Sequence, residues 1–133
     1  MWYRGSLTVP ADTAAAAYAS AEVEVCRGTI TKFYRLFAPG CAGQVALQVF
    51  YQTRQIFPTT PGEFYLGDDS EILGDASVEL DEPDFLLELR GWSPGTTYQH
   101  IIYCEFYIPR PTIYIPSVLD RPFVSIPADL GVL

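Results

Sequence analysis

Short segments with alternating apolar and polar side chains follow one another along the chain, separated by glycine- and proline-containing turns about every 8 to 12 residues. This spacing leaves little room for ordinary helices and is typical of a β-sandwich or barrel. The composition agrees, because 14% of the 133 residues are aromatic and Tyr and Phe favour strands. We therefore predict one all-β domain, a β-sandwich or jelly-roll-like barrel of about eight strands with extended N- and C-terminal arms.

Residues 44–52 have the clearest alternation. They place Val45, Leu47, Val49 and Tyr51 on one face and glutamines on the other, which is the pattern of a strand with one buried side. The other predicted strands span residues 2–9, 21–26, 28–37, 62–66, 76–80, 85–92 and 97–108, and residues 54–57 are predicted to extend the strand of residues 44–52.

Two predicted strands are apolar on both faces. In residues 28–37, one face has Ile30, Tyr34 and Leu36, and the other has Phe33, Arg35 and Phe37. The inner face predicted for residues 97–108 consists of Tyr98, His100, Ile102, Cys104, Phe106 and Ile108. A single copy that left one of these faces uncovered would expose a large apolar patch. The pattern therefore predicts contacts with other subunits.

The two ends of the chain differ from its middle. Residues 1–20 comprise a predicted strand followed by an alanine-rich linker. The alanine-rich stretch, residues 11–21, forms either a short helix or an extended segment. Residues 21–108 are the predicted sandwich core. Residues 109–133 hold five of the eleven prolines yet are strongly apolar, so we expect an extended arm lying on an apolar surface. Its predicted interface residues are Ile113, Tyr114, Ile115, Phe123, Val124 and Ile126.

The charge balance excludes two classes of partner. The chain has eight Lys and Arg residues and sixteen Asp and Glu residues, which give a net charge of −8. Binding to nucleic acid or to anionic membranes needs a cationic surface instead. No apolar run has the length of a membrane span, and Met1–Arg4 do not begin a signal peptide. We therefore expect no nucleic-acid or membrane partner.

Few residues suggest chemistry. Between Glu63 and Glu88 lie ten carboxylates and no Lys or Arg; within this stretch Asp68, Asp69 and Glu71 are weak candidates for a calcium site. Two other interpretations of this acidic stretch remain: its carboxylates form a solvated rim, or they face arginines of a neighbouring subunit. A metal set of Cys26, Cys41, Cys104 and His100 is arithmetically possible, although cysteines of this spacing are more often small buried apolar residues.

His100 is the single histidine, and no nucleophile elbow or phosphate-binding glycine loop is present. We therefore predict no enzyme, no catalytic residue and no cofactor.

Four segments give the chain a resemblance to the small all-β proteins of phage and virus particles, namely capsid decoration proteins and single jelly-roll capsid proteins. They are Phe37-Ala38-Pro39-Gly40-Cys41-Ala42-Gly43-Gln44-Val45, Ile56-Phe57-Pro58, Gly67-Asp68-Asp69 and Tyr98-Gln99-His100-Ile101. The resemblance covers roughly residues 21–108. It implies a non-enzymatic virion protein, assembled in the host cytoplasm, whose partners are copies of itself (a trimer is one option) and the major capsid or another virion protein.

An alternative is a carbohydrate- or receptor-binding β-sandwich of a phage tail or adhesion protein, because exposed aromatic side chains stack on sugars as well as on proteins. The aromatic candidates for either role include Phe33, Phe50, Tyr51, Phe64, Tyr65, Trp92, Tyr103 and Tyr107.

Overall fold

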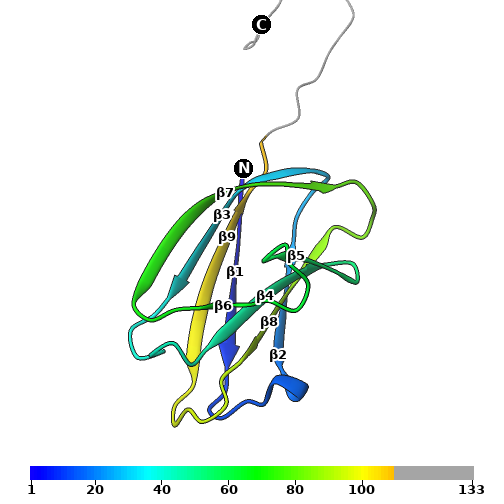
Figure 1. Cartoon of the computed structure of the whole chain (residues 1–133). Helices are drawn as coiled ribbons and strands as arrows, with labels where there is room; N and C mark the ends of the chain where they lie inside the picture. Colours follow the sequence, from blue (N-terminus) through cyan, green and yellow to red (C-terminus); the bar gives the residue numbers. More distant parts are fainter. Residues whose placement is uncertain (110–133) are drawn as a thin grey trace, which may run out of the picture.

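The computed structural model describes residues 1–109, and within them nine strands form two antiparallel sheets that lie face to face (Figure 1). The strands are β1 (Trp2–Val9), β2 (Ala19–Glu24), β3 (Gly28–Phe37), β4 (Ala46–Tyr51), β5 (Arg54–Phe57), β6 (Tyr65–Leu66), β7 (Ser70–Leu80), β8 (Leu86–Trp92) and β9 (His100–Tyr107). A single 3-10 turn, η1 (Ala15–Ala17), precedes β2. The predicted arm interface, Ile113, Tyr114, Ile115, Phe123, Val124 and Ile126, lies outside the described residues.

The strands pair about the middle of the chain, like one long hairpin folded over on itself. β4 pairs with β5, β3 with β7, β2 with β8 and β1 with β9. Successive pairs lie in alternate sheets, and the pairings of β3 with β9 and β4 with β8 join them. The resulting orders are β1-β9-β3-β7 and β2-β8-β4-β5, with β6 on the same side of β4 as β5. This wrapped hairpin is a jelly roll, so the predicted β-sandwich is confirmed, whereas the predicted N-terminal arm is instead paired as strand β1 and the predicted C-terminal arm lies outside the described residues.

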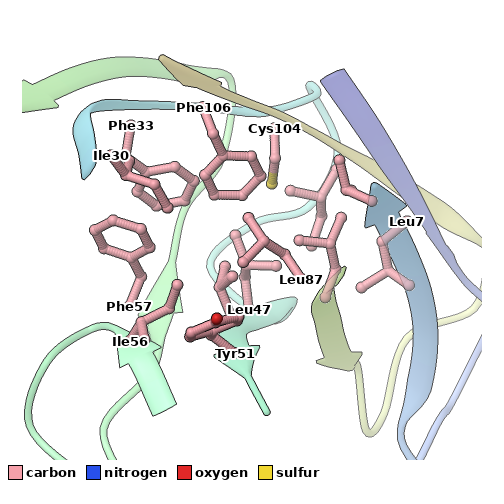
Figure 2. Packing of buried hydrophobic residues seen from close by; sticks show 14 of the residues in the cluster. Leu7, Ile30, Phe33, Leu47, Tyr51, Ile56, Phe57, Leu87, Cys104 and Phe106 are labelled. Atoms are coloured by element: carbon pink, nitrogen blue, oxygen red, sulfur yellow. The ribbon is translucent and has the colours of Figure 1, made fainter. Parts of the chain in front are cut away.

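The core lies between the two sheets, where the alternating apolar residues of both meet (Figure 2). The predicted inner face of β4 is confirmed, because Val45, Leu47, Val49 and Tyr51 are all buried. Phe33 of β3 stacks on Phe57 of the opposite sheet, with ring centroids 4.4 Å apart, and on Phe106 of the neighbouring strand β9, at 5.1 Å.

Strand β3 corrects the predicted two-sided pattern. Its pairing with β7 shifts between Ile30 and Lys32, where Thr31 lies opposite two residues of β7, Ala76 and Ser77, so the extra residue of this β-bulge is in β7. The bulge turns Phe33 and Phe37 inward on the same side as Ile30, and all three are buried. Most of the apolar surface of this strand is therefore covered within one copy, and the prediction that Ile30 lies opposite Phe33 is wrong.

Several further boundaries differ from the predictions. Residues 54–57 do not extend the preceding strand but form β5, which pairs back on β4. β9 begins at His100, and Tyr98 is 75% exposed in the preceding loop rather than inward-facing. β7 begins at Ser70 and is the longest strand described. β1 pairs with β9 along its whole length, so the N-terminal strand is an integral part of the sandwich. The alanine-rich stretch after it forms only the short turn η1 before β2 begins.

The two sides of the sandwich are closed differently. On one side β1 packs closely on β2, because a side chain at Gly5 would overlap the methyl group of Val23. On the other side β7 and β5 end their sheets without pairing to each other. Within the described residues the sandwich is therefore sealed at β1 and β2 and open at β7 and β5.

Candidate functional site

The outward side of the β1-β9-β3-β7 sheet carries a surface that we call the outer A face. Register places its side chains in three rows across the strands: Trp2, Tyr107, Lys32 and Asp75; Arg4, Glu105, Tyr34 and Leu73; and Ser6, Tyr103, Leu36 and Glu71. Leu73 is 57% exposed, Tyr103 45% and Trp2 41%. Large apolar side chains this exposed on one sheet face indicate a binding surface.

The charges of the outer A face are compensated within it. Arg4 Nε lies 3.6 Å from Glu105 Oε2, and Lys32 Nζ lies 3.1 Å from Asp75 Oδ1. Tyr34 donates its hydroxyl hydrogen to Glu71 Oε2 at 2.7 Å, and this hydrogen bond raises the pKa of Tyr34. Each carboxylate of the three rows thus has a partner, which lowers the cost of covering this face.

The opposite sheet carries a second aromatic cluster, the outer B face. The Arg90 guanidinium lies 3.9 Å from the Phe50 ring centroid and 4.6 Å from that of Tyr18, and it pairs with Glu88 at 2.9 Å. Beside it, the Phe64 and Trp92 rings meet edge to face at 5.3 Å. The cluster combines stacking surfaces with a fixed cation, a combination suited to planar or sugar ligands.

A groove follows the open side of the sandwich. Near the end where β9 finishes it encloses about 500 Å³ between β5 and β7, with Arg54 on one wall and Glu79 and Asp81 on the other. Further along it encloses about 300 Å³ over an apolar floor that includes Phe57 and Tyr65. The groove is therefore polar at one end and aromatic at the other.

Arg35 projects into the aromatic end of the groove. Its guanidinium stacks on Tyr65 at 3.9 Å from the ring centroid, and burial lowers its pKa. Among residues 1–109 no carboxylate lies within ion-pair distance of it. The sequence alternation placed Arg35 on the same face of the strand as Phe33 and Phe37. That this face is directed towards the other sheet follows only from the bulge between β3 and β7.

The structure does not assemble the predicted metal candidates. Asp68 Oδ1 accepts a hydrogen bond from Gly40 N at 3.0 Å, Glu71 is held by Tyr34, and Asp69 occupies a left-handed turn position with φ 46°. In the described part of the chain no three Asp, Glu, His or Cys side chains are grouped closely enough to hold a metal ion. This includes the set of three cysteines and His100.

The cysteines are free thiols, two of them buried as small apolar side chains. Burial raises the pKa of Cys104 to about 12 and also raises that of Cys41. Cys26 is only half-buried. His100 is half-buried at the start of β9, with its ring near Gly40. These groups are thus distributed over the fold and do not form a common site.

The aromatic candidates divide among four places. Phe33 and Tyr51 are buried in the core, Tyr65 lines the groove, Tyr103 and Tyr107 lie on the outer A face, and Phe50, Phe64 and Trp92 lie on the outer B face.

Among the described residues, no helix has both the length and the apolar character needed to cross a membrane. No protein-family model matches the chain, and no curated protein is similar to it. The basis for assigning a function is therefore the chemistry of the outer A face, the outer B face and the groove.

Proposed function

We propose that this protein is a non-enzymatic structural subunit of a virus or phage particle, which assembles with copies of itself and decorates or forms part of the shell. The observation that supports this most is the outer A face, where Trp2, Leu73 and Tyr103 remain 41–57% exposed although each could be buried by a neighbour. The jelly-roll order of the strands adds support, because virus capsid domains use this architecture.

The physical argument concerns the cost of leaving the outer A face in water. Burying apolar surface contributes roughly 25 cal/mol per Å², and aromatic residues are the usual anchors of protein interfaces. Covering a charged face would normally oppose this gain through desolvation. Here Arg4 and Lys32 are paired with carboxylates of the same face, so a second copy need not supply counter-charges.

The net negative charge of the protein favours attachment to a basic partner. A net charge of −8 on each copy produces repulsion between copies unless a partner of opposite charge is present. A basic patch on the major shell protein would both relieve this repulsion and attract the subunit to the shell. Attachment should therefore weaken as salt concentration rises.

Matched double variants test the assembly proposal. Tyr103→Ser with Leu73→Ser removes the exposed apolar groups of the outer A face, and Phe64→Ser with Leu66→Ser does the same on the outer B face. We expect native mass spectrometry to find oligomers of the unmodified protein and of the outer B variant, and smaller species of the outer A variant. A monomeric unmodified protein would contradict the assembly proposal, and unchanged oligomers of the outer A variant would contradict the role of the outer A face in it.

One observation favours a second candidate function, a carbohydrate- or receptor-binding module. Arg90 is fixed between Phe50 and Tyr18, beside the exposed pair of Phe64 and Trp92, and such aromatic platforms stack on sugar rings. A glycan array on the same two double variants distinguishes the roles. Glycan binding that disappears only in the outer B variant would favour this second function.

A further inference from the structure

Strand β7 is an unusually long open edge. It spans Ser70–Leu80, eleven residues, and among residues 1–109 it pairs with β3 on one side only. The unpaired backbone groups of such an edge can accept an added strand, and natural proteins normally shorten, twist or cover them. The groove that runs beside β7 would be covered by the same added strand, because Val78 and Glu79 line it.

The segment that fits this edge is in the chain itself. Residues 112–126 lie between Pro111 and Pro127 and contain Pro116 and Pro122. In a strand, the backbone N–H groups alternate between two sides, so only every second residue donates to a given neighbour. Both internal prolines are even-numbered, so every odd-numbered residue from 113 to 125 keeps its N–H. The segment can therefore pair continuously along one side, with both prolines facing away.

Contacts at the end of β9 fix the point from which the segment begins. Ile108 is held in line with β9 by Met1, whose amino group donates to Ile108 O at 2.8 Å while Met1 O accepts from Ile108 N at 3.0 Å. Ile108 and Arg110 each precede a proline, which disfavours the helical backbone values of a common turn. A proline-rich sequence favours an extended chain of about 3 Å per residue. Such a chain would continue in the direction of β9, whereas the same copy's β7 lies two strands away across β3.

Charge determines which partner the edge accepts. Carboxylates recur at every fourth position of β7, at Glu71, Asp75 and Glu79, and the strand contains no Lys or Arg. Two β7 edges would therefore repel each other. Residues 110–133 contain two Arg and two Asp and are neutral overall. The neutral, apolar segment is thus the better partner for β7 than a second β7.

We infer that residues 112–126 of one copy add as a strand to β7 of a second copy and cover its groove. This inference rests on the proposed self-assembly and names the surfaces that exchange.

Two adjacent proline substitutions test the pairing. Leu119→Pro removes an N–H that must face β7, whereas Val118→Pro, its matched control, removes one that faces away. We expect hydrogen exchange, followed by mass spectrometry of the full-length protein, to find β7 amides protected in the unmodified oligomer and in Val118→Pro. In Leu119→Pro the same amides should exchange at least tenfold faster. Equal protection in both variants, or the reverse order, would overturn the inference.

Single cysteines show which copy supplies the segment. Ser117→Cys in one copy is mixed with Ser77→Cys in another, and Ser20→Cys on β2 replaces Ser77→Cys as the control. Disulfide-linked pairs are expected with Ser77→Cys and not with Ser20→Cys. A chain carrying both Ser117→Cys and Ser77→Cys that links only within itself would show that the segment covers its own edge, which contradicts exchange.

The oligomer mass separates the two proposals. Stable oligomers without β7 protection or cross-links would refute the exchange and leave the assembly proposal standing. A monomer at every concentration would refute the assembly proposal itself.

Discussion

Replacing Arg35 should leave the free energy of unfolding nearly unchanged, although the residue lies between the sheets. Its guanidinium stacks on Tyr65 at 3.9 Å, an interaction worth about 0.5–2 kcal/mol. Against this, burial lowers the pKa of Arg35, because the charge loses water without gaining a carboxylate. In Arg35→Met the aliphatic stem remains packed and the desolvated charge is removed, so the two effects offset within about 1 kcal/mol.

Arg90 is the matched control, since it also stacks on aromatic rings and is also partly buried. Its Nη2 and Nε atoms lie 2.9 and 3.0 Å from Glu88 Oε1, and charge-assisted hydrogen bonds contribute about 1.5–3 kcal/mol each where burial is complete. With 26% of the Arg90 side chain exposed, screening reduces that figure, and we expect Arg90→Met to lose about 1–2 kcal/mol.

Urea unfolding followed by tryptophan fluorescence measures both variants, at one fixed protein concentration because assembly makes apparent stability depend on concentration. Slopes equal to that of the unmodified protein would confirm that only stability has changed. If Arg35→Met lost as much as Arg90→Met, Arg35 would be a structural cation with a stabilising partner. A near-neutral result would leave its charge available to whatever occupies the groove.

Three further results are expected. As pH rises from 9 towards 12, Cys104 should lower the free energy of unfolding by about 1.4 kcal/mol per pH unit, because its thiol releases the proton near pH 9 when unfolded and only at about 12 when folded. The free energy of unfolding of Cys104→Ala should therefore decrease less steeply with pH than that of the unmodified protein, and identical slopes would contradict this. Iodoacetamide at pH 8 should modify Cys26 first in the native protein, as mass mapping can check, and early modification of Cys104 would be inconsistent with its burial. Tyr51→Phe should cost about 1–3 kcal/mol in urea unfolding, because the Tyr51 hydroxyl donates to Glu82 O and accepts from Glu82 N, and a cost near zero would show that water replaces these bonds.

The strands with one buried face could be predicted from the sequence, because alternation with a period of two is a local property. Val45, Leu47 and Val49 occupy the inner side as predicted. The bulge between β3 and β7 could not be predicted, since its extra residue belongs to the partner strand, where Ala76 and Ser77 lie opposite Thr31 and neither is a glycine. The regular alternation of β3 is broken at this point, so Ile30 and Phe33 are both buried although they are three residues apart, which explains why they were placed on opposite sides.

The outer A face could be predicted only in part. Each of its strands has visible alternation, but Tyr34, Leu73 and Tyr103 become neighbours through pairings between distant parts of the chain. Tyr98 was misplaced for a different reason. Residues of this loop are fixed by the β1–β2 connection, where Asp12 N donates to Thr96 Oγ1 at 2.9 Å and Asp12 Oδ1 accepts from Gly95 N at 2.7 Å, so the strand cannot begin before His100.

The asymmetry between the two sides of the sandwich bears on how copies would assemble. The side formed by β1 and β2 is sealed by small residues, since a side chain at Gly91 would lie 2.7 Å from Leu7 Cδ2 and one at Gly5 would overlap Val23. Among the strands at the sheet edges β7 is the longest, so it offers a partner the longest site for an added strand. The proposed contact joins two different surfaces, a donated segment and a receiving edge, and such head-to-tail contacts generate rings or continuing arrays instead of isolated pairs. A two-fold pair could arise only by reciprocal exchange, in which both edges are filled and growth stops. The size distribution of the oligomers therefore distinguishes a shell-forming subunit from a simple dimer.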